Sequence, residues 1–112
     1  MTIGVCAAAP AGPISLFDGR SFAGWQGDTT NTWRIEQGAI VGGSLRATVP
    51  QNEFLTTTGR YTNFVLCLEF RLVGTEGFIN GGVQIRSERL SQPANEKCGY
   101  QAAQGDDWWG AL

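Results

Sequence analysis

Histidine is absent from the 112-residue chain, and long apolar runs and clusters of one charge are absent as well. Without histidine there is neither a Ser-His-Asp nor a Cys-His catalytic arrangement, and no imidazole can bind a metal ion. Any chemistry must therefore use carboxylates, arginine, tyrosine or lysine. Apolar runs such as FVLCL at residues 64–68 are far shorter than the roughly 20 residues of a membrane helix, so no membrane span is expected.

Charge and cysteine content exclude further classes. Eight basic and ten acidic residues leave a net charge of −2 with no basic cluster, which argues against a nucleic-acid partner. Three cysteines without CxxC spacing predict neither a zinc site nor a disulfide framework, and Cys67 is expected to be a small buried residue. No metal site or cofactor is identified. Asp106 and Asp107 are neighbours that point apart in an extended segment, and a solvated turn explains them better than a divalent cation does.

The N-terminal residues 1–14 are mostly small and apolar and lack the basic region of a complete signal peptide. We expect an unstructured stump there, for which a signal-peptide remnant is one explanation. Residues 15–112 then form the domain.

The composition and the residue patterns predict an all-β chain. Glycine is abundant at 16 residues, and Thr, Val, Phe and Trp recur in short runs. Residues 33–41 predict a hairpin with a turn at Gln37-Gly38, and residues 64–72 alternate apolar and polar side chains. Six or seven short strands are typical of a sandwich or barrel, whose core would include Trp25 and Trp33.

The stretch NGGVQIRSER, residues 80–89, predicts a strand with two different faces. Side-chain alternation predicts one face formed by Gln84, Arg86 and Glu88 and an opposite face formed by Val83, Ile85 and Ser87. The polar face is either a solvated sheet surface or the floor of a ligand-binding cleft.

Several motifs occur together in one order: LFDG (16–19), GW (24–25), WRIEQGAI (33–40), YTNFVLCLEFRL (61–72), NGGVQIRSER, GYQ (99–101) and WWG (108–110). In this order they resemble the 3-keto-disaccharide hydrolase domain family over residues 15–112. The resemblance implies a concanavalin-like jelly-roll β-sandwich, usually in exported bacterial proteins. It also implies a small saccharide substrate and cleavage of glycosides oxidised at C3. Because the family's module continues with a Tyr-Asp-Glu-like stretch, we expect residues 15–112 to be its N-terminal part, incomplete at the C-terminus.

The resemblance has one departure that bears on catalysis. Family members commonly carry an acidic residue directly after the GY dipeptide or two positions beyond it, where this chain has Gln101 and Ala103. A carboxylate expected at the cleft is then missing. A carbohydrate-binding β-sandwich without catalysis is therefore the alternative to an enzyme, and a structural or interaction domain is a third reading.

Cleavage of a 3-keto glycoside needs a base, an oxyanion stabiliser and an acid for the leaving group. Arg86 is the candidate oxyanion stabiliser, because its guanidinium presents several donors in a fixed fork; its structural alternative is a surface ion pair with Glu69 or Glu88. Glu88 is the candidate base, because it is the carboxylate on the predicted Arg86 face, and a solvated strand end is the competing interpretation.

Five further residues are predicted to bind the saccharide: Gln84, Tyr100, Gln101, Trp108 and Trp109. Trp108 and Trp109 offer flat surfaces for a sugar ring, although packing in a core is the commoner role of tryptophan. Tyr100 either donates a proton or packs with its hydroxyl at the surface.

Overall fold

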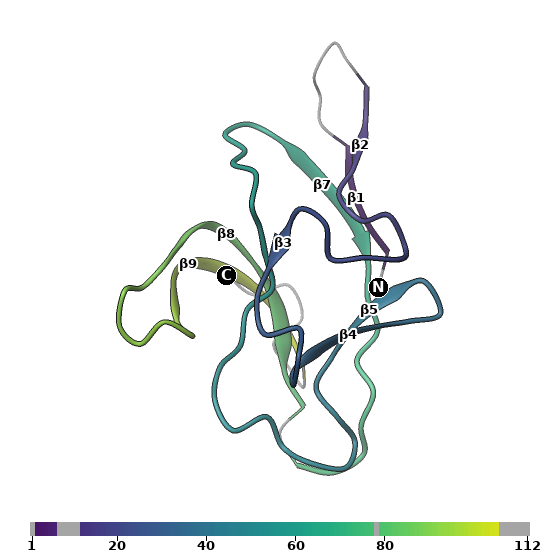
Figure 1. Cartoon of the computed structure of the whole chain (residues 1–112), viewed down its shortest axis with the longest axis vertical. Coiled ribbons are helices and arrows are strands. Elements are labelled where there is room, and N and C mark those ends of the chain that lie inside the picture. The colour runs from purple at the N-terminus through teal and green to yellow at the C-terminus, as the bar shows by residue number, and fades with distance from the viewer. Residues whose placement is uncertain (1, 7–11, 78, 106–112) are drawn as a thin grey trace. The chain divides into compact units, whose positions relative to one another are not determined.

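The computed structural model describes residues 2–6, 12–77 and 79–105, and the regular elements of these residues are all strands (Figure 1). They are β1 (Thr2–Cys6), β2 (Ile14–Ser15), β3 (Trp25–Gln26), β4 (Trp33–Glu36), β5 (Ala39–Gly42), β6 (Thr56–Thr57), β7 (Val65–Glu69), β8 (Gly81–Arg89) and β9 (Lys97–Gln104). The prediction of an all-β chain is confirmed. Across the part of the chain that the structure describes, no helix is long and apolar enough to cross a membrane.

The strands form small antiparallel sheets. One has the order β2-β1-β7, and the others are the pairs β3-β6, β4-β5 and β8-β9. Contacts divide the chain into two compact units, residues 1–44 with 55–70 and residues 45–54 with 71–112. The first unit holds the first three sheets, and the second holds β8 and β9.

Strand β1 lies within residues 1–14, where the sequence predicts an unstructured stump. Thr2–Cys6 pair antiparallel with all of β7, and β1 also pairs with β2. The small apolar residues that suggested a stump are compatible with a strand, because pairing with β7 satisfies their main-chain groups.

Strand β7 keeps the predicted alternation. Leu66 and Leu68 are half-buried and pack against the core, whereas Val65, Cys67 and Glu69 are exposed. The prediction that Cys67 is buried is therefore wrong. Its position in the alternation, and not its small apolar side chain, decides which face it occupies.

The core of the first unit is small. Phe17 and Ile40 are its buried hydrophobic residues, with 6% and 4% of their surfaces exposed. Partly buried side chains pack around them: Leu16, Phe22, Trp25, Trp33, Ile35, Leu55, Leu66 and Leu68. Trp25 and Trp33 thus contribute to the core as the sequence predicted.

The hairpin of β4 and β5 forms where the sequence predicts it. Gln37 and Gly38 have φ angles of 50° and 75°, as a two-residue type I′ turn requires. Trp33 lies across Gly42, where a Cβ atom would come within 2.5 Å of the indole ring. Only a glycine at this position leaves room for the ring.

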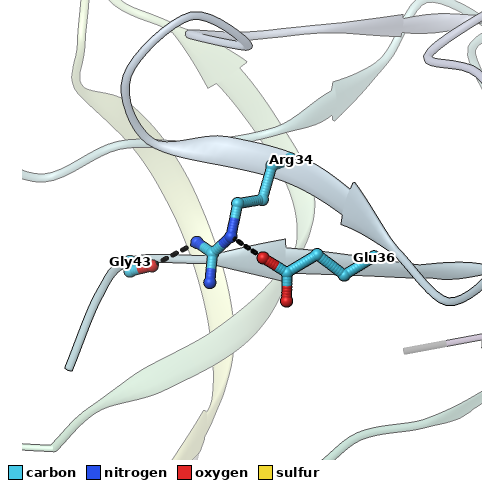
Figure 2. A network of polar contacts seen from close by, with 3 residues as sticks. All are labelled: Arg34, Glu36 and Gly43. Carbon is cyan, nitrogen blue, oxygen red and sulfur yellow. Dashed lines mark hydrogen bonds and ion pairs between the residues drawn. The ribbon is translucent and has the colours of Figure 1, made fainter.

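The outward face of this hairpin carries a polar network. Figure 2 shows the Arg34 guanidinium between the Glu36 carboxylate and the main-chain carbonyl of Gly43, with which it forms an ion pair and a hydrogen bond. Both charged side chains are about half exposed, at 45% and 55%. An exposed pair of this kind contributes little to stability, so we assign this network to the surface of the fold.

Candidate functional site

The β8–β9 hairpin places the two predicted amide ligands against each other. Gln84 is paired with Gln101 in the register, and Gln84 Nε2 donates to Gln101 Oε1 at 3.5 Å. Gln84 Oε1 is buried and has no hydrogen-bond partner in the described part of the chain. A buried acceptor without a donor costs free energy, so this oxygen is a candidate to bind a hydroxyl group.

A glycine in β8 makes room for the amides. Gly82 pairs with Ala103, and a Cβ atom on Gly82 would lie 2.6 Å from Gln101 Nε2. The Gln101 side chain therefore lies over bare main chain. The small pair Gly82 and Ala103 leaves this end of the hairpin without large side chains beside the amides.

A β-bulge interrupts β8 next to the amides. The pairing passes from Ile85 opposite Tyr100 to Glu88 opposite Cys98, so that Arg86 and Ser87 together face the single residue Gly99. Arg86 has a φ of 48°, a left-handed conformation that side chains other than glycine rarely adopt. Its side chain is exposed.

Gly99 is required by this bulge. A Cβ atom on Gly99 would lie 2.3 Å from Ser87 Cβ and 2.7 Å from Ser87 Cα. The Ser87 side chain consequently occupies the side of the hairpin to which a residue at position 99 would point. Positions 99 and 101 of β9 lie on the same face, because side chains alternate along a strand. Ser87 therefore lies on the face that carries Gln101.

The bulge corrects the predicted faces of β8. Arg89 is opposite Lys97, and Lys97 shares its face of β9 with Gln101, so Arg89 and Ser87 lie on the Gln84 side. Glu88 is opposite Cys98 and lies on the side of Tyr100. The predicted face of Gln84, Arg86 and Glu88 is thus wrong, because the inserted residue shifts the alternation by one position.

The polar face of the hairpin is formed by Gln84, Ser87, Arg89, Lys97 and Gln101, all half-buried. The opposite face is formed by Val83, Ile85, Glu88, Cys98, Tyr100 and Ala102. Figure 1 shows β8 and β9 side by side as a twisted pair. Tyr100 is 66% exposed and lies on the face opposite to Gln101, so the structure does not bring these two predicted saccharide ligands together.

At the far end of the polar face, Arg89 is fixed by main-chain acceptors. Its guanidinium donates to the carbonyl oxygens of Ala94 at 2.8 Å and Phe54 at 3.1 Å. Burial and the neighbouring Arg89 charge lower the pKa of Lys97, while Glu88 acts in the opposite direction. Arg89 and Lys97 are therefore neighbouring cations, and Lys97 has a reduced tendency to be protonated.

A loop from earlier in the chain holds this end of the hairpin. Asn52 Nδ2 donates to Glu96 Oε1 at 2.8 Å, and Asn95 Nδ2 donates to the carbonyl oxygen of Asn52 at 3.1 Å. Together with the Arg89 contact to Phe54, these hydrogen bonds join residues 52–54 to the connection between β8 and β9. The loop fixes the position of Arg89 and of the connection that precedes Lys97.

Sequence reasoning missed Ser87, Arg89 and Lys97 as members of the polar face. The signal was Gly99 inside a strand pattern, because an isolated glycine in a strand indicates a bulge or a close approach of main chains. Trp108 and Trp109, the remaining predicted saccharide ligands, and Asp106 and Asp107 lie outside the described residues. Within the described residues no group of three or more Cys, Asp or Glu side chains gathers as metal ligands do.

The model of the 3-keto-alpha-glucoside-1,2-lyase-like domain matches residues 12–111. No curated protein and no solved structure matches the chain.

Proposed function

This chain belongs to the 3-keto-alpha-glucoside-1,2-lyase-like domain family, and from this membership we propose that it cleaves glycosides whose sugar ring carries a ketone at C3. The observation that carries the proposal is the family match over residues 12–111, which includes the whole described part of the β8–β9 hairpin. A jelly-roll sandwich and export from a bacterial cell belong to the same proposal.

The proposed reaction begins at C2. The C3 ketone acidifies the C2 hydrogen, a base removes this proton, and the electron pair forms an enolate. The enolate reforms the ketone and expels the C1 oxygen, which takes up a proton and leaves as the alcohol, so that a C1–C2 double bond results. Addition of water across that double bond, with its oxygen at C1, gives the free 3-keto sugar and completes a net hydrolysis.

Gln84 and Gln101 are the proposed saccharide ligands. Each amide offers both a donor and an acceptor, as sugar hydroxyls require, and the acceptor Gln84 Oε1 lacks a partner within the described residues. Partial burial of both amides reduces competition from water. The missing Cβ atom of Gly82 gives the Gln101 side chain room to lie beside Gln84, so this glycine positions the amide pair.

Arg86 is the proposed stabiliser of the enolate oxygen. Its left-handed φ of 48° costs about 1–2 kcal/mol relative to a glycine, and such strain is commonly found at functional positions. A guanidinium keeps its positive charge whatever the surroundings, so it suits a developing oxyanion.

A carbohydrate-binding module without catalysis is the second candidate, and one observation favours it. The polar face carries no carboxylate among its residues, because the bulge places Glu88 on the opposite side and positions 101 and 103 are Gln and Ala. Such a face binds sugar hydroxyls without supplying a carboxylate base.

Turnover of 4-nitrophenyl 3-keto-α-glucoside separates these functions. We expect the chain to release 4-nitrophenol from this compound and to leave the unoxidised 4-nitrophenyl α-glucoside intact, since only the ketone acidifies C2. Calorimetric titration with the same 3-keto compound measures binding independently. Binding without release of nitrophenol supports the module without catalysis, and neither heat nor release refutes both functions.

A further inference from the structure

The proposed reaction needs a base, and the polar face offers few. Histidine is absent from the chain, and the carboxylate predicted for this role, Glu88, lies on the opposite face. Neither Gln84 nor Gln101 accepts a proton at neutral pH, and the Ser87 hydroxyl has no imidazole to activate it. Arg89 keeps its proton in proteins. Lys97 is the one remaining titratable side chain on this face.

We infer that Lys97, in its neutral form, is the base that removes the C2 proton, an assignment that rests on the proposed function. Lys97 is half-buried on the same face as the amide pair, and its ammonium has no ion-pair partner among the described residues. The directly opposite residue, Arg89, is held by two main-chain carbonyls, so its positive charge stays beside Lys97.

The surroundings of Lys97 favour the neutral amine. Burial and the Arg89 charge both lower its pKa, against the weaker effect of Glu88. The carboxylate of the preceding residue, Glu96, accepts a hydrogen bond from Asn52 and is thereby engaged with the loop. A desolvated lysine beside another cation is a known way to obtain an amine base near neutral pH.

The spacing on β9 suits a two-ring substrate. Lys97 and Gln101 are four positions apart on β9, which is about 13 Å between their Cα atoms at about 3.3 Å per residue. Gly99 lies between them and contributes no side chain of its own, and the small Ser87 side chain of β8 covers this position. We place one ring of a 3-keto disaccharide at the amides and the oxidised ring within reach of the long Lys97 side chain.

The lone pair of the neutral Lys97 amine takes the C2 proton and the amine becomes an ammonium, while the C2–H electron pair forms the enolate. Expulsion of the C1 oxygen restores the ketone and forms the C1–C2 double bond. The Lys97 ammonium then gives a proton to the departing oxygen, which returns the amine to its neutral form without any other reactant.

The first test replaces Lys97 itself and measures turnover of 4-nitrophenyl 3-keto-α-glucoside. Lys97→Ala and Lys97→Arg should each lower kcat by about 100-fold or more, the usual contribution of a positioned base, because neither supplies a neutral amine. Both should still bind the 3-keto compound in the calorimeter. Added ethylamine should restore turnover to Lys97→Ala and not to Lys97→Arg, whose side chain fills the site. A Lys97→Ala variant with wild-type kcat overturns the assignment.

The second test uses charge to move the pH profile. On the acid side of the pH profile, kcat/KM should rise with pH as the Lys97 amine loses its proton. The midpoint of this acid limb should therefore report the pKa of Lys97. Glu88→Gln removes a charge that raises this pKa, so the limb should move to lower pH. Arg89→Gln removes a charge that lowers it, so the limb should move to higher pH. Loss of turnover in Glu88→Gln would identify Glu88 as the base and overturn the role of Lys97.

Failure of the proposed reaction and failure of the Lys97 assignment give different results. Wild-type protein that binds the 3-keto compound without releasing nitrophenol refutes the enzyme, and the base with it. Wild-type turnover that persists in Lys97→Ala refutes the base alone. If circular dichroism shows that Lys97→Ala does not fold, the pH profile of Glu88→Gln provides the test instead. A shift of the acid side of its kcat/KM profile to lower pH supports Lys97 as the base, and an unchanged profile overturns the assignment.

Discussion

Gln84 shows how a single residue can cost stability and still suit a site. Its Oε1 is buried without a hydrogen-bond partner in the described part of the chain, and an unsatisfied acceptor of this kind costs about 1–3 kcal/mol. Gln84→Met removes this acceptor with little change in shape. We expect urea denaturation to show equal or higher stability, and calorimetry to show roughly 3- to 10-fold weaker binding of the 3-keto compound, because one neutral hydrogen bond contributes about 0.5–1.5 kcal/mol. Unchanged binding would remove Gln84 from the site.

Asp18 provides a pH-dependent test at the same scale. Its carboxylate accepts hydrogen bonds from the Ser21 hydroxyl at 2.6 Å and from the main-chain N–H groups of Arg20 and Ser21. These bonds lower the pKa of Asp18 from 3.8 to about 2. The folded pKa is depressed, so the stabilisation is complete above pH 3.8 and is lost as the pH falls towards 2. An NMR titration of the Asp18 carboxyl carbon should show this low midpoint, and Ser21→Ala should raise it. A midpoint near 3.8 in the wild-type protein would contradict these contacts.

At the scale of elements, the β8 bulge depends on Gly99. Gly99→Ala would bring a Cβ atom to 2.3 Å from Ser87 Cβ and 2.7 Å from Ser87 Cα, so the main chain must move. Overpacking of this kind typically costs about 1–3 kcal/mol, measurable by urea denaturation. Ser87→Gly in the same chain removes the closer atom and should recover part of the loss. If Gly99→Ala is as stable as the wild type, the bulge is not fixed by this contact.

The elements also show how far sequence patterns predict this structure. Alternation located β7, and the Gln37-Gly38 pair located the β4–β5 turn, because period two and positive φ at a turn are local properties. The same alternation failed in β8, since it assumes uninterrupted pairing and Arg86 adopts a left-handed conformation. Gln84 and Gln101, proposed as saccharide ligands through the family resemblance, lie opposite each other in the hairpin, and their role as ligands stays a prediction. Arg89 and Lys97 share this face because of the bulge, which depends on the register between β8 and β9 and not on the sequence of β8 alone.

At the scale of the whole molecule, stability depends on a small core. Phe17 and Ile40 are the buried hydrophobic residues of the described chain, and marginal total stability makes each of them important. Ile40→Ala should lower the free energy of unfolding by about 2–5 kcal/mol, since the lost burial is combined with a cavity. Ile14→Ala is the matched control: it makes the same change at a side chain that is 53% exposed, so its cost should be much smaller. Both free energies of unfolding are measured by urea titration of the purified chain. They are compared if the dependence of the free energy on urea concentration, the m-value, is the same in both variants. Equal losses in the two variants would mean that Phe17 and Ile40 do not form the core of the first unit, whereas a large difference would confirm that this unit is stabilised by very few buried side chains.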